Sequence, residues 1–503
     1  MTLSLYPTPE DILAFEGTET HAAVCVRIFA DTQTPISLFQ TLSTKEKNAF
    51  LLESVENGSS TGRYSFIGAA PHSYITFQDS IATIHQDASV STTAFDDPLD
   101  IIETHLNKKS VWVPKELPRF VGGAVGYLGF DCIRYFERIP IPQTRSIEIP
   151  EGVFLLCDDP CIYDHLRRTI SFVKIISLAG DRRATVDETL RELEERVHAL
   201  TSAQHGADAF RALDAGPQPA QVTIEMTHHT SQQDMEDVVR SCQEAIRNGE
   251  VFQIVPSQRF TVHEHIDPLD LYRVLRSLNP SPYHFLLHFE EFQVVGSSPE
   301  VLVRVDHDEI LIRPIAGTRP RSSCPEEERQ LEKDLLGDEK ERAEHRMLVD
   351  LGRNDLGKVS AIGTVEVDDY MHIEKYSHVM HIVSDVISKR SSSSTVFDVF
   401  RSCFPAGTVS GAPKIRACEL LSQLEKMRRG LYAGAVGYFG YNNAMDTCIA
   451  IRTLVVEKNQ THIQAGAGIV FDSIPEKEHL ECLHKAKAAL LAIQRCLHLE
   501  GTQ

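Results

Sequence analysis

The chain has 503 residues, of which 42% are hydrophobic and 24% are charged, and these proportions are ordinary for a globular protein with a large core. The formal net charge of −21 argues against nucleic-acid binding, because a polyanion would be repelled. No apolar run is long enough to span a bilayer and no secretory signal is visible at the start, so we expect no membrane association. Eleven scattered cysteines are interpreted as free thiols in a reducing cytoplasm.

The first part of the chain, residues 1–200, predicts short strands separated by turns, at residues 23–28, 48–53 and 65–67. A glycine-dense apolar run at residues 120–130 predicts a strand packed tightly against another backbone. Apolar residues with helical spacing predict a helix over residues 185–200. Residues 201–222 are rich in Ala, Gly, Pro and Gln without a clear period, and we interpret them as a linker before a second region, residues 223–503.

The second region is more regular. Its patterns predict a helix over residues 231–249, a strand over 251–255, a strand over 309–312, a helix over 326–351 and a strand over 372–387. The sequence Gly-Ala-Val-Gly-Tyr at residues 123–127 returns at 434–438. Two glycine-rich strands at corresponding places in two related sheets would explain this repeat, as would chance similarity. We use it only to favour a sheet-rich α+β architecture.

Residues 313–321 predict a turn around Gly317 and Thr318, with three arginines close by. Glycine lets a backbone approach a ligand closely, and the Thr hydroxyl adds a donor. Three arginines within nine residues favour an anionic partner, either a carboxylate or a phosphate. A solvated loop would have the same composition.

Two pairs of glutamates lie three residues apart on predicted helices, Glu341 with Glu344 and Glu478 with Glu481. Residues three apart share one helix face, so each pair can direct two carboxylates at one point, and Mg²⁺ prefers such oxygen ligands. A solvated helix face, or a surface pair between Glu481 and Lys485, explains the same spacing.

Further stretches resemble the chorismate-binding enzymes and follow one another from about residue 230 to 490. They include Ser297-Ser-Pro-Glu300, Pro314-Ile-Ala-Gly-Thr-Arg319, Leu348-Val-Asp-Leu-Gly-Arg-Asn-Asp355, Phe404-Pro-Ala-Gly-Thr-Val-Ser-Gly-Ala-Pro-Lys414 and Gln464-Ala-Gly-Ala-Gly-Ile-Val470. Weaker matches at residues 51–54 and 63–68 extend the resemblance over nearly the whole chain, and the similarity is greatest to the anthranilate synthase component I branch. The resemblance implies two large, mostly antiparallel sheets packed as a sandwich and flanked by helices. It also implies a regulatory and partner-binding N-terminal region and a chorismate-binding C-terminal region.

The activity that this resemblance implies is conversion of chorismate and ammonia to anthranilate and pyruvate, the first committed step of tryptophan biosynthesis. Glu300 would protonate the leaving hydroxyl at ring carbon four, and His381 would assist the elimination of pyruvate. Mg²⁺ would be held by Glu344 and Glu481, supported by Glu341 and Glu478. Substrate-binding positions of the family match Gly317, Thr318, Thr408, Tyr432, Arg452, Gly466, Ala467, Gly468 and Lys485.

Two positions distinguish the members of this family. Relatives that add water resemble one another in carrying a lysine base where this chain has Gln253, and aminodeoxychorismate synthase component I, of the folate pathway, often carries a nucleophilic lysine where this chain has Ala316. Both residues therefore favour ammonia as the nucleophile and anthranilate as the product. Aminodeoxychorismate synthesis remains the alternative, because some of those enzymes lack the lysine.

A partner and a regulator are also implied. The sequence contains no Gly-x-Cys-x-Gly nucleophile elbow, so ammonia from glutamine would require a separate glutamine amidotransferase subunit. The resemblance implies feedback inhibition by tryptophan, bound by Ser54 with Pro282, Tyr283 and His284, where bacterial relatives commonly carry Met at position 284. An inactive chorismate binder and a structural scaffold are the readings from other functional classes, and turnover and stabilisation by chorismate would separate them.

Overall fold

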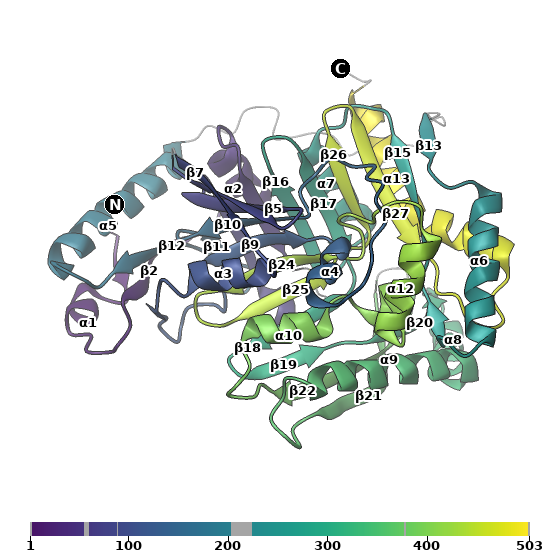
Figure 1. Ribbon diagram of the computed structural model, residues 1–503. Helices are drawn as coiled ribbons and strands as arrows, with labels where there is room; N and C mark the ends of the chain where they lie inside the picture. The colour runs from purple at the N-terminus through teal and green to yellow at the C-terminus, as the bar shows by residue number, and fades with distance from the viewer. Residues whose placement is uncertain (1–2, 55–59, 88, 203–223, 377–378, 501–503) are drawn as a thin grey trace.

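The computed structural model describes residues 3–54, 60–87, 89–202, 224–376 and 379–500. Within these residues, two large sheets pack against each other and helices cover their outer faces (Figure 1). The expected α+β sandwich is therefore confirmed.

In the described part of the chain, thirteen strands form the first sheet, and all its strand pairs are antiparallel except β2 with β8. N-terminal strands meet C-terminal strands where β3 pairs with β16, so both regions of the chain build this sheet. In spatial order the strands are β1 (Leu5–Tyr6), β2 (His21–Phe29), β12 (Thr169–Ser177), β11 (Cys161–Asp164), β4 (Tyr64–Ala69), β3 (Ala49–Glu53), β16 (Tyr283–His288), β17 (Gln293–Ser298), β26 (Thr453–Glu457), β27 (Gln460–Gly466), β15 (Ser257–Val262) and β13 (Met226–His228), with β8 (Val111–Trp112) beside β2.

Twelve described strands form the second sheet, and here the two regions meet where β9 pairs with β24. In spatial order they are β20 (Ile315–Pro320), β22 (Val379–Lys389), β19 (Glu309–Ile312), β18 (Val301–Asp306), β25 (Met445–Ile449), β24 (Ala435–Gly440), β9 (Gly123–Leu128), β10 (Gly152–Cys157), β5 (Ser73–Gln78), β6 (Ile81–Gln86) and β7 (Ser89–Ala94), with β21 (Glu366–Lys375) on β22. A short separate pair joins β14 (Gln253–Ile254) to β23 (Gly411–Ala412).

The repeated Gly-Ala-Val-Gly sequences are the adjacent strands β9 and β24. They lie in one sheet, which excludes the explanation by corresponding strands of two related sheets. The predicted close approach of backbones is confirmed, because a Cβ atom on Gly126 would lie 1.8 Å from the carbonyl oxygen of Val153. Glycine at this position lets two strands approach where any side chain would collide.

Strand alternation divides the side chains of β16 between two environments. Tyr283, Phe285 and Leu287 belong to the aromatic core between the two sheets. Leu286 belongs to the core on the other face, and the ring of His284 packs edge-on to Tyr272 of α7 at 6.5 Å between ring centroids. The strand therefore connects the inter-sheet core with the helix layer.

Helices cover the outer faces of the sheets, and α13 packs on β27 and against α6 and α7. The described helices are α1 (Pro9–Leu13), α2 (Pro35–Ser43), α3 (Pro98–Leu106), α4 (Ile133–Phe136), α5 (Arg182–Ser202), α6 (Gln232–Arg247), α7 (Pro268–Leu278), α8 (Pro325–Gly337), α9 (Glu339–Gly357), α10 (Val396–Cys403), α11 (Gly407–Ser410), α12 (Lys414–Leu424) and α13 (Pro475–Glu500). Among the described residues, no helix combines the length and apolar character needed to cross a bilayer.

Several element boundaries differ from the sequence-based expectation. The helix expected over residues 326–351 is two helices, because Asp338 is extended and its carboxylate caps α9 by accepting from the backbone N–H groups of Lys340 and Glu341. The strand expected over 372–387 is two strands, β21 and β22, and the strand over 251–255 is reduced to β14. The expected linker lies outside the described residues except for residues 201–202, which end α5.

The turn expected at residues 313–321 is mostly strand β20, which has an irregular register between Ala316 and Thr318. Gly317 has a φ of +69°, a conformation that glycine adopts without strain. This irregularity lets the strand bend where it reaches the site described next.

Candidate active site

A cavity of about 630 Å³ lies between α9 and α13, against β20 and the end of β27. It brings together most of the residues expected to bind chorismate, although they are distant in sequence. Those that line it are Glu300, Gly317, Thr318, Glu341, Glu344, Thr408, Tyr432, Arg452, Gly466, Gly468, Glu478, Glu481 and Lys485.

Glu300 sits between β17 and β18, with its side chain in this cavity. Burial raises the pKa of its carboxyl group to about 8, although the Thr408 hydroxyl and the charge of Lys485 partly oppose that shift. A carboxyl group with this pKa retains its proton near neutral pH. Glu300 can therefore act as a general acid.

His381 lies on β22 beside Thr318 of β20 and is outside the cavity lining. Its Nδ1 atom is 2.9 Å from the carbonyl oxygen of Gly317, which can only accept, so Nδ1 carries the proton. Burial lowers the pKa of the ring below its usual value, the Gly317 carbonyl opposes this, and the charge of Arg452 adds to it. A neutral ring protonated at Nδ1 leaves Nε2 free to take a proton.

Arg452 supplies a partly buried positive charge to the cavity. Burial lowers the pKa of its guanidinium group. Its Nη1 donates to Oδ1 of Asn279 at 3.4 Å, and among the described residues no carboxylate forms an ion pair with it. A buried charge without a counter-ion is unfavourable, so this position favours an anionic ligand.

Lys485 of α13 brings a second positive charge. Its Nζ donates to the carbonyl oxygen of Gly466 at 3.0 Å and pairs with Glu481 at 2.8 Å. Gly466 itself lies against Tyr432, because a Cβ atom there would be 2.7 Å from the Tyr432 hydroxyl oxygen. Lys485 therefore stands between the predicted metal ligands and the glycine-rich end of β27.

Ala467 does not line the cavity. It is fully buried, and its backbone N–H donates to the carbonyl oxygen of Pro256 at 3.2 Å. The expected use of this N–H for substrate binding is therefore not supported, whereas its neighbours Gly466 and Gly468 do line the cavity.

The four glutamates line the cavity from two facing helices, Glu341 and Glu344 from α9 and Glu478 and Glu481 from α13. The pKa of Glu341 is raised by burial and then by the charge of Glu344. The pKa of Glu478 is raised by burial, with a further contribution from Glu481. Such carboxylates suit a hard cation, but among the described residues no three acidic, His or Cys side chains converge on one metal position.

The three arginines of residues 313–321 do not reach the cavity. Arg313 pairs with Glu374 and Asp385, Arg319 with Asp334 and Asp338, and Arg321 with Glu328. All three arginines are thus paired with the protein's own carboxylates, and Arg313 lines a different cavity, described below. From this stretch, Ile315, Gly317 and Thr318 line the larger cavity.

Five further polar residues line the cavity that were not among the expected site residues, namely Gln253, Asn279, Lys340, Gln464 and Ser473. Asn279 follows α7, and its side-chain amide donates to the Ser297 hydroxyl at 3.0 Å while its oxygen faces Arg452. Lys340 precedes Glu341 in the predicted metal stretch, which is the signal that could have identified it.

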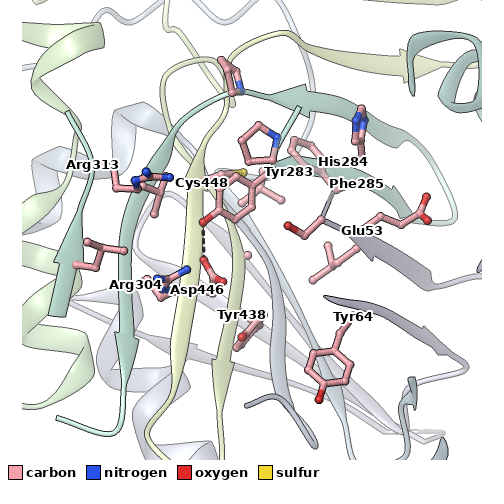
Figure 2. Close-up of a pocket in the computed structure, with 18 of the residues that line it drawn as sticks. Glu53, Tyr64, Tyr283, His284, Phe285, Arg304, Arg313, Tyr438, Asp446 and Cys448 are labelled. Atoms are coloured by element: carbon pink, nitrogen blue, oxygen red, sulfur yellow. Dashed lines mark hydrogen bonds between the residues drawn. The ribbon is translucent and has the colours of Figure 1, made fainter. Parts of the chain in front are cut away.

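A second cavity of about 270 Å³ lies between the two sheets (Figure 2). All four residues of the expected tryptophan site line it: Ser54, Pro282, Tyr283 and His284. The Tyr283 hydroxyl donates to Oδ1 of Asp446 at 2.8 Å and so joins β16 to β25 across the sandwich (Figure 2).

The two cavities share a wall. Ile315 lines both of them. Pro299 and Val301 line the inter-sheet cavity, whereas Glu300 between them faces the larger one. Occupancy of one cavity can therefore affect the other through one short segment.

Comparison with known proteins agrees with this arrangement. Residues 47–491 match the model of the family described as chorismate binding enzyme. Anthranilate synthase component 1 of Acetivibrio thermocellus is 41% identical over 97% of this chain and 98% of its own length. The crystal structure of anthranilate synthase component I from Streptococcus pneumoniae TIGR4 matches 92% of this chain and 98% of its own, with 36% identity and a TM-score of 0.74. The menaquinone-specific isochorismate synthase of Escherichia coli shares the fold, with 18% identity and a TM-score of 0.69. The chain belongs to the chorismate-binding enzyme family.

Proposed function

We propose that this chain is the large subunit of an anthranilate synthase, which converts chorismate and ammonia to anthranilate and pyruvate. The relatives that bear this name span nearly the whole chain. The observation that carries the proposal is that one cavity holds both the Glu300 carboxyl group, whose pKa is raised to about 8, and the partly buried Arg452 guanidinium group, which has no carboxylate partner among the described residues. An acid for a leaving group and a cation for a carboxylate are the two features that this reaction needs.

In the first step the nitrogen of ammonia forms a bond to ring carbon two, the ring double bonds shift, and the bond from carbon four to its hydroxyl oxygen breaks. Glu300 donates a proton to that oxygen, which leaves as water. The new ammonium group releases a proton to solvent, and solvent reprotonates Glu300. Atoms and charge therefore balance in this step.

In the second step the proton at carbon two is removed and the carbon–oxygen bond at carbon three breaks. The ring becomes aromatic, and the side chain leaves as the enolate of pyruvate, which takes up one proton at its methylene carbon to become pyruvate. His381, neutral and with Nε2 free, is the residue that we assign to this proton.

We propose that Arg452, Lys485 and the Gly317–Thr318 backbone hold the substrate carboxylates, with Tyr432, Thr408 and the glycines at 466 and 468 shaping the cavity. Mg²⁺ would be held by Glu344 and Glu481, supported by Glu341 and Glu478, with a substrate carboxylate completing the ligand set. When bound, it would supply positive charge to the ring carboxylate.

Anthranilate is favoured over aminodeoxychorismate as the product because Ala316, a buried residue of β20, has no nucleophilic side chain.

We also propose a separate glutamine amidotransferase subunit as the source of ammonia. Ten of the eleven cysteines of this chain are buried, and Cys324 alone is exposed, which supports a glutaminase nucleophile on another chain. The free thiols support the cytoplasm as the proposed location.

Tryptophan is the proposed inhibitor, bound in the inter-sheet cavity. The aromatic walls suit an indole ring, and Tyr64, Phe66, Tyr283 and Tyr438 are among them (Figure 2). Asn279 supports a connection between the inter-sheet cavity and the active site. It contacts Arg452 in the larger cavity and lies three residues before Pro282, which lines the inter-sheet cavity.

The test is an assay of the purified chain alone with chorismate, Mg²⁺ and an ammonium salt at mildly alkaline pH. We expect anthranilate and pyruvate in equal amounts, identified by chromatography. Aminodeoxychorismate without pyruvate would instead assign the chain to the folate-pathway branch. No turnover, combined with stabilisation by chorismate, would indicate an inactive binder.

A further inference from the structure

The side chain of Gln253 lies in the larger cavity and is held there by one strong contact. Gln253 belongs to the short strand β14 and is only 4% exposed. Its Nε2 donates to Oε1 of Glu344 at 2.8 Å. Gly468 leaves the space for this amide, because a Cβ atom at that position would lie 2.7 Å from Nε2.

This contact fixes the orientation of the amide. A carboxylate oxygen can only accept, so the group facing Glu344 must be the NH₂ group of Gln253. The carbonyl oxygen, Oε1, is consequently directed elsewhere. It is buried and has no hydrogen-bond partner among the described residues.

A buried amide oxygen without a donor is unfavourable, typically by more than a satisfied hydrogen bond contributes. Such an atom on the wall of a substrate cavity indicates a ligand that donates a hydrogen bond there. The carboxylates of chorismate are acceptors and do not fit this requirement, and its one hydroxyl group, at carbon four, is assigned to Glu300. Ammonia fits, since it has three N–H bonds and uses its lone pair for attack.

We propose that Oε1 of Gln253 binds the attacking ammonia and directs its lone pair towards the substrate; this inference rests on the proposed anthranilate synthase activity. As the carbon–nitrogen bond forms, the nitrogen gains positive charge and its N–H bonds become stronger donors. The contact with Oε1 then strengthens in the transition state, so it accelerates the reaction as well as binding the nucleophile.

The same contact selects against water. Water must lose a proton to become a good nucleophile, and an amide oxygen is too weak a base to take it. Ammonia is already nucleophilic and needs only to be held in position. An amide at position 253 therefore favours ammonia over water as the nucleophile.

The rival role for Gln253 is purely structural, as a donor that positions Glu344. The two roles use different atoms of one amide, Oε1 for ammonia and Nε2 for Glu344. Steady-state kinetics with ammonium, chorismate and Mg²⁺ varied in turn can separate the two roles. Only the ammonia-binding role predicts a change that is confined to kcat/KM for ammonia.

The experiment compares the wild-type chain with Gln253→Met, which retains the length of the side chain and removes both polar atoms. The purified chain is assayed for anthranilate while ammonium, chorismate and Mg²⁺ are varied in turn. We expect kcat/KM for ammonia to fall at least tenfold, with the KM for chorismate at saturating Mg²⁺ changed less than threefold. The control is Gln258→Met, a buried glutamine of β15 whose Oε1 accepts from His479 Nδ1, and it should leave kcat/KM for ammonia unchanged.

A second variant, Gln253→Glu, retains an acceptor oxygen and loses the donor to Glu344. We expect this variant to recover part of kcat/KM for ammonia relative to the Met variant. The Mg²⁺ concentration that it needs for half-maximal rate should rise. The inference is wrong if kcat/KM for ammonia is unchanged in Gln253→Met. It is also wrong if kcat/KM for ammonia, the KM for chorismate and the Mg²⁺ requirement all change in parallel in that variant. Failure of the proposed function would be visible separately, as the absence of anthranilate from the wild-type chain.

Discussion

At the scale of single residues, Glu300 shows how burial creates a catalytic group. We predict that Glu300→Gln lowers kcat/KM by about a hundredfold or more, since a general acid contributes about 10²–10⁴-fold. The rate of the wild-type enzyme should also fall as pH rises through about 8, because Glu300 then loses its proton. Steady-state rates across pH 6–10 test both points, with Glu309→Gln, an exposed carboxylate of β19, as the control.

The same carboxyl group makes stability depend on pH. Its pKa is about 8 when folded and near its ordinary 4.5 when unfolded, so the folded state binds more protons between these values and stability falls as pH rises across them. Glu300→Gln should therefore raise Tm relative to wild type at pH 8–9, with a smaller gain near pH 5. An equal gain at both pH values would contradict this assignment.

Arg452 leads to a prediction with two opposite effects. Arg452→Met should raise the KM for chorismate about 10–100-fold, because hydrogen bonds to charged groups contribute about 1.5–3 kcal/mol. It should also raise the Tm of the free protein slightly, because it removes a partly buried charge that has no counter-ion among the described residues. Arg429→Met is the matched control. Arg429 is buried and paired with Glu425, so its loss should lower Tm.

The family motifs predicted most of the residues that line the larger cavity. Only the structure shows which other residues they contact. The sequence could not show that Arg313 pairs with Glu374 and Asp385, because those carboxylates are about 60 and 70 residues away along the chain. For the same reason the orphaned oxygen of Gln253 could not be seen in the sequence, since its orientation depends on Glu344.

At the scale of elements, hydrophobic periodicity predicted long elements such as α5 and α6 and central strands such as β3 and β9 correctly. It failed where a single residue breaks a pattern. Asp338 divides one expected helix into two by capping α9, and local spacing of apolar residues does not report a cap.

The close packing of β9 gives a prediction at this scale. Gly126→Ala would place a Cβ atom against the carbonyl oxygen of Val153, and overpacking of this kind costs about 1–3 kcal/mol. We expect a lower midpoint of urea unfolding. Gly357→Ala in α9 is the control, because a Cβ atom there meets nothing within 4 Å and alanine favours helix. A midpoint for Gly126→Ala equal to that of wild type would show that β10 can shift to make room.

At the scale of the whole molecule, the two regions of the chain are not separate layers. N-terminal strands pair with C-terminal strands in both sheets, β3 with β16 and β9 with β24. The inter-sheet cavity is consequently built from both regions, with Ser54 from one and Tyr283 from the other. A ligand in that cavity would contact Pro299 and Val301, which flank Glu300 in the wall shared with the larger cavity.

This shared wall predicts a reciprocal coupling between tryptophan and chorismate. If tryptophan weakens chorismate binding by some factor, chorismate must weaken tryptophan binding by the same factor, and couplings of about 5–150-fold are typical. Calorimetric titration with tryptophan, with and without saturating chorismate and Mg²⁺ and without ammonia, measures this factor directly. Phenylalanine, which lacks the indole N–H, serves as the comparison ligand. If tryptophan inhibits turnover but its Kd does not depend on chorismate, the predicted coupling is wrong. The inhibition would then act on the chemical step and not on chorismate binding through the shared wall.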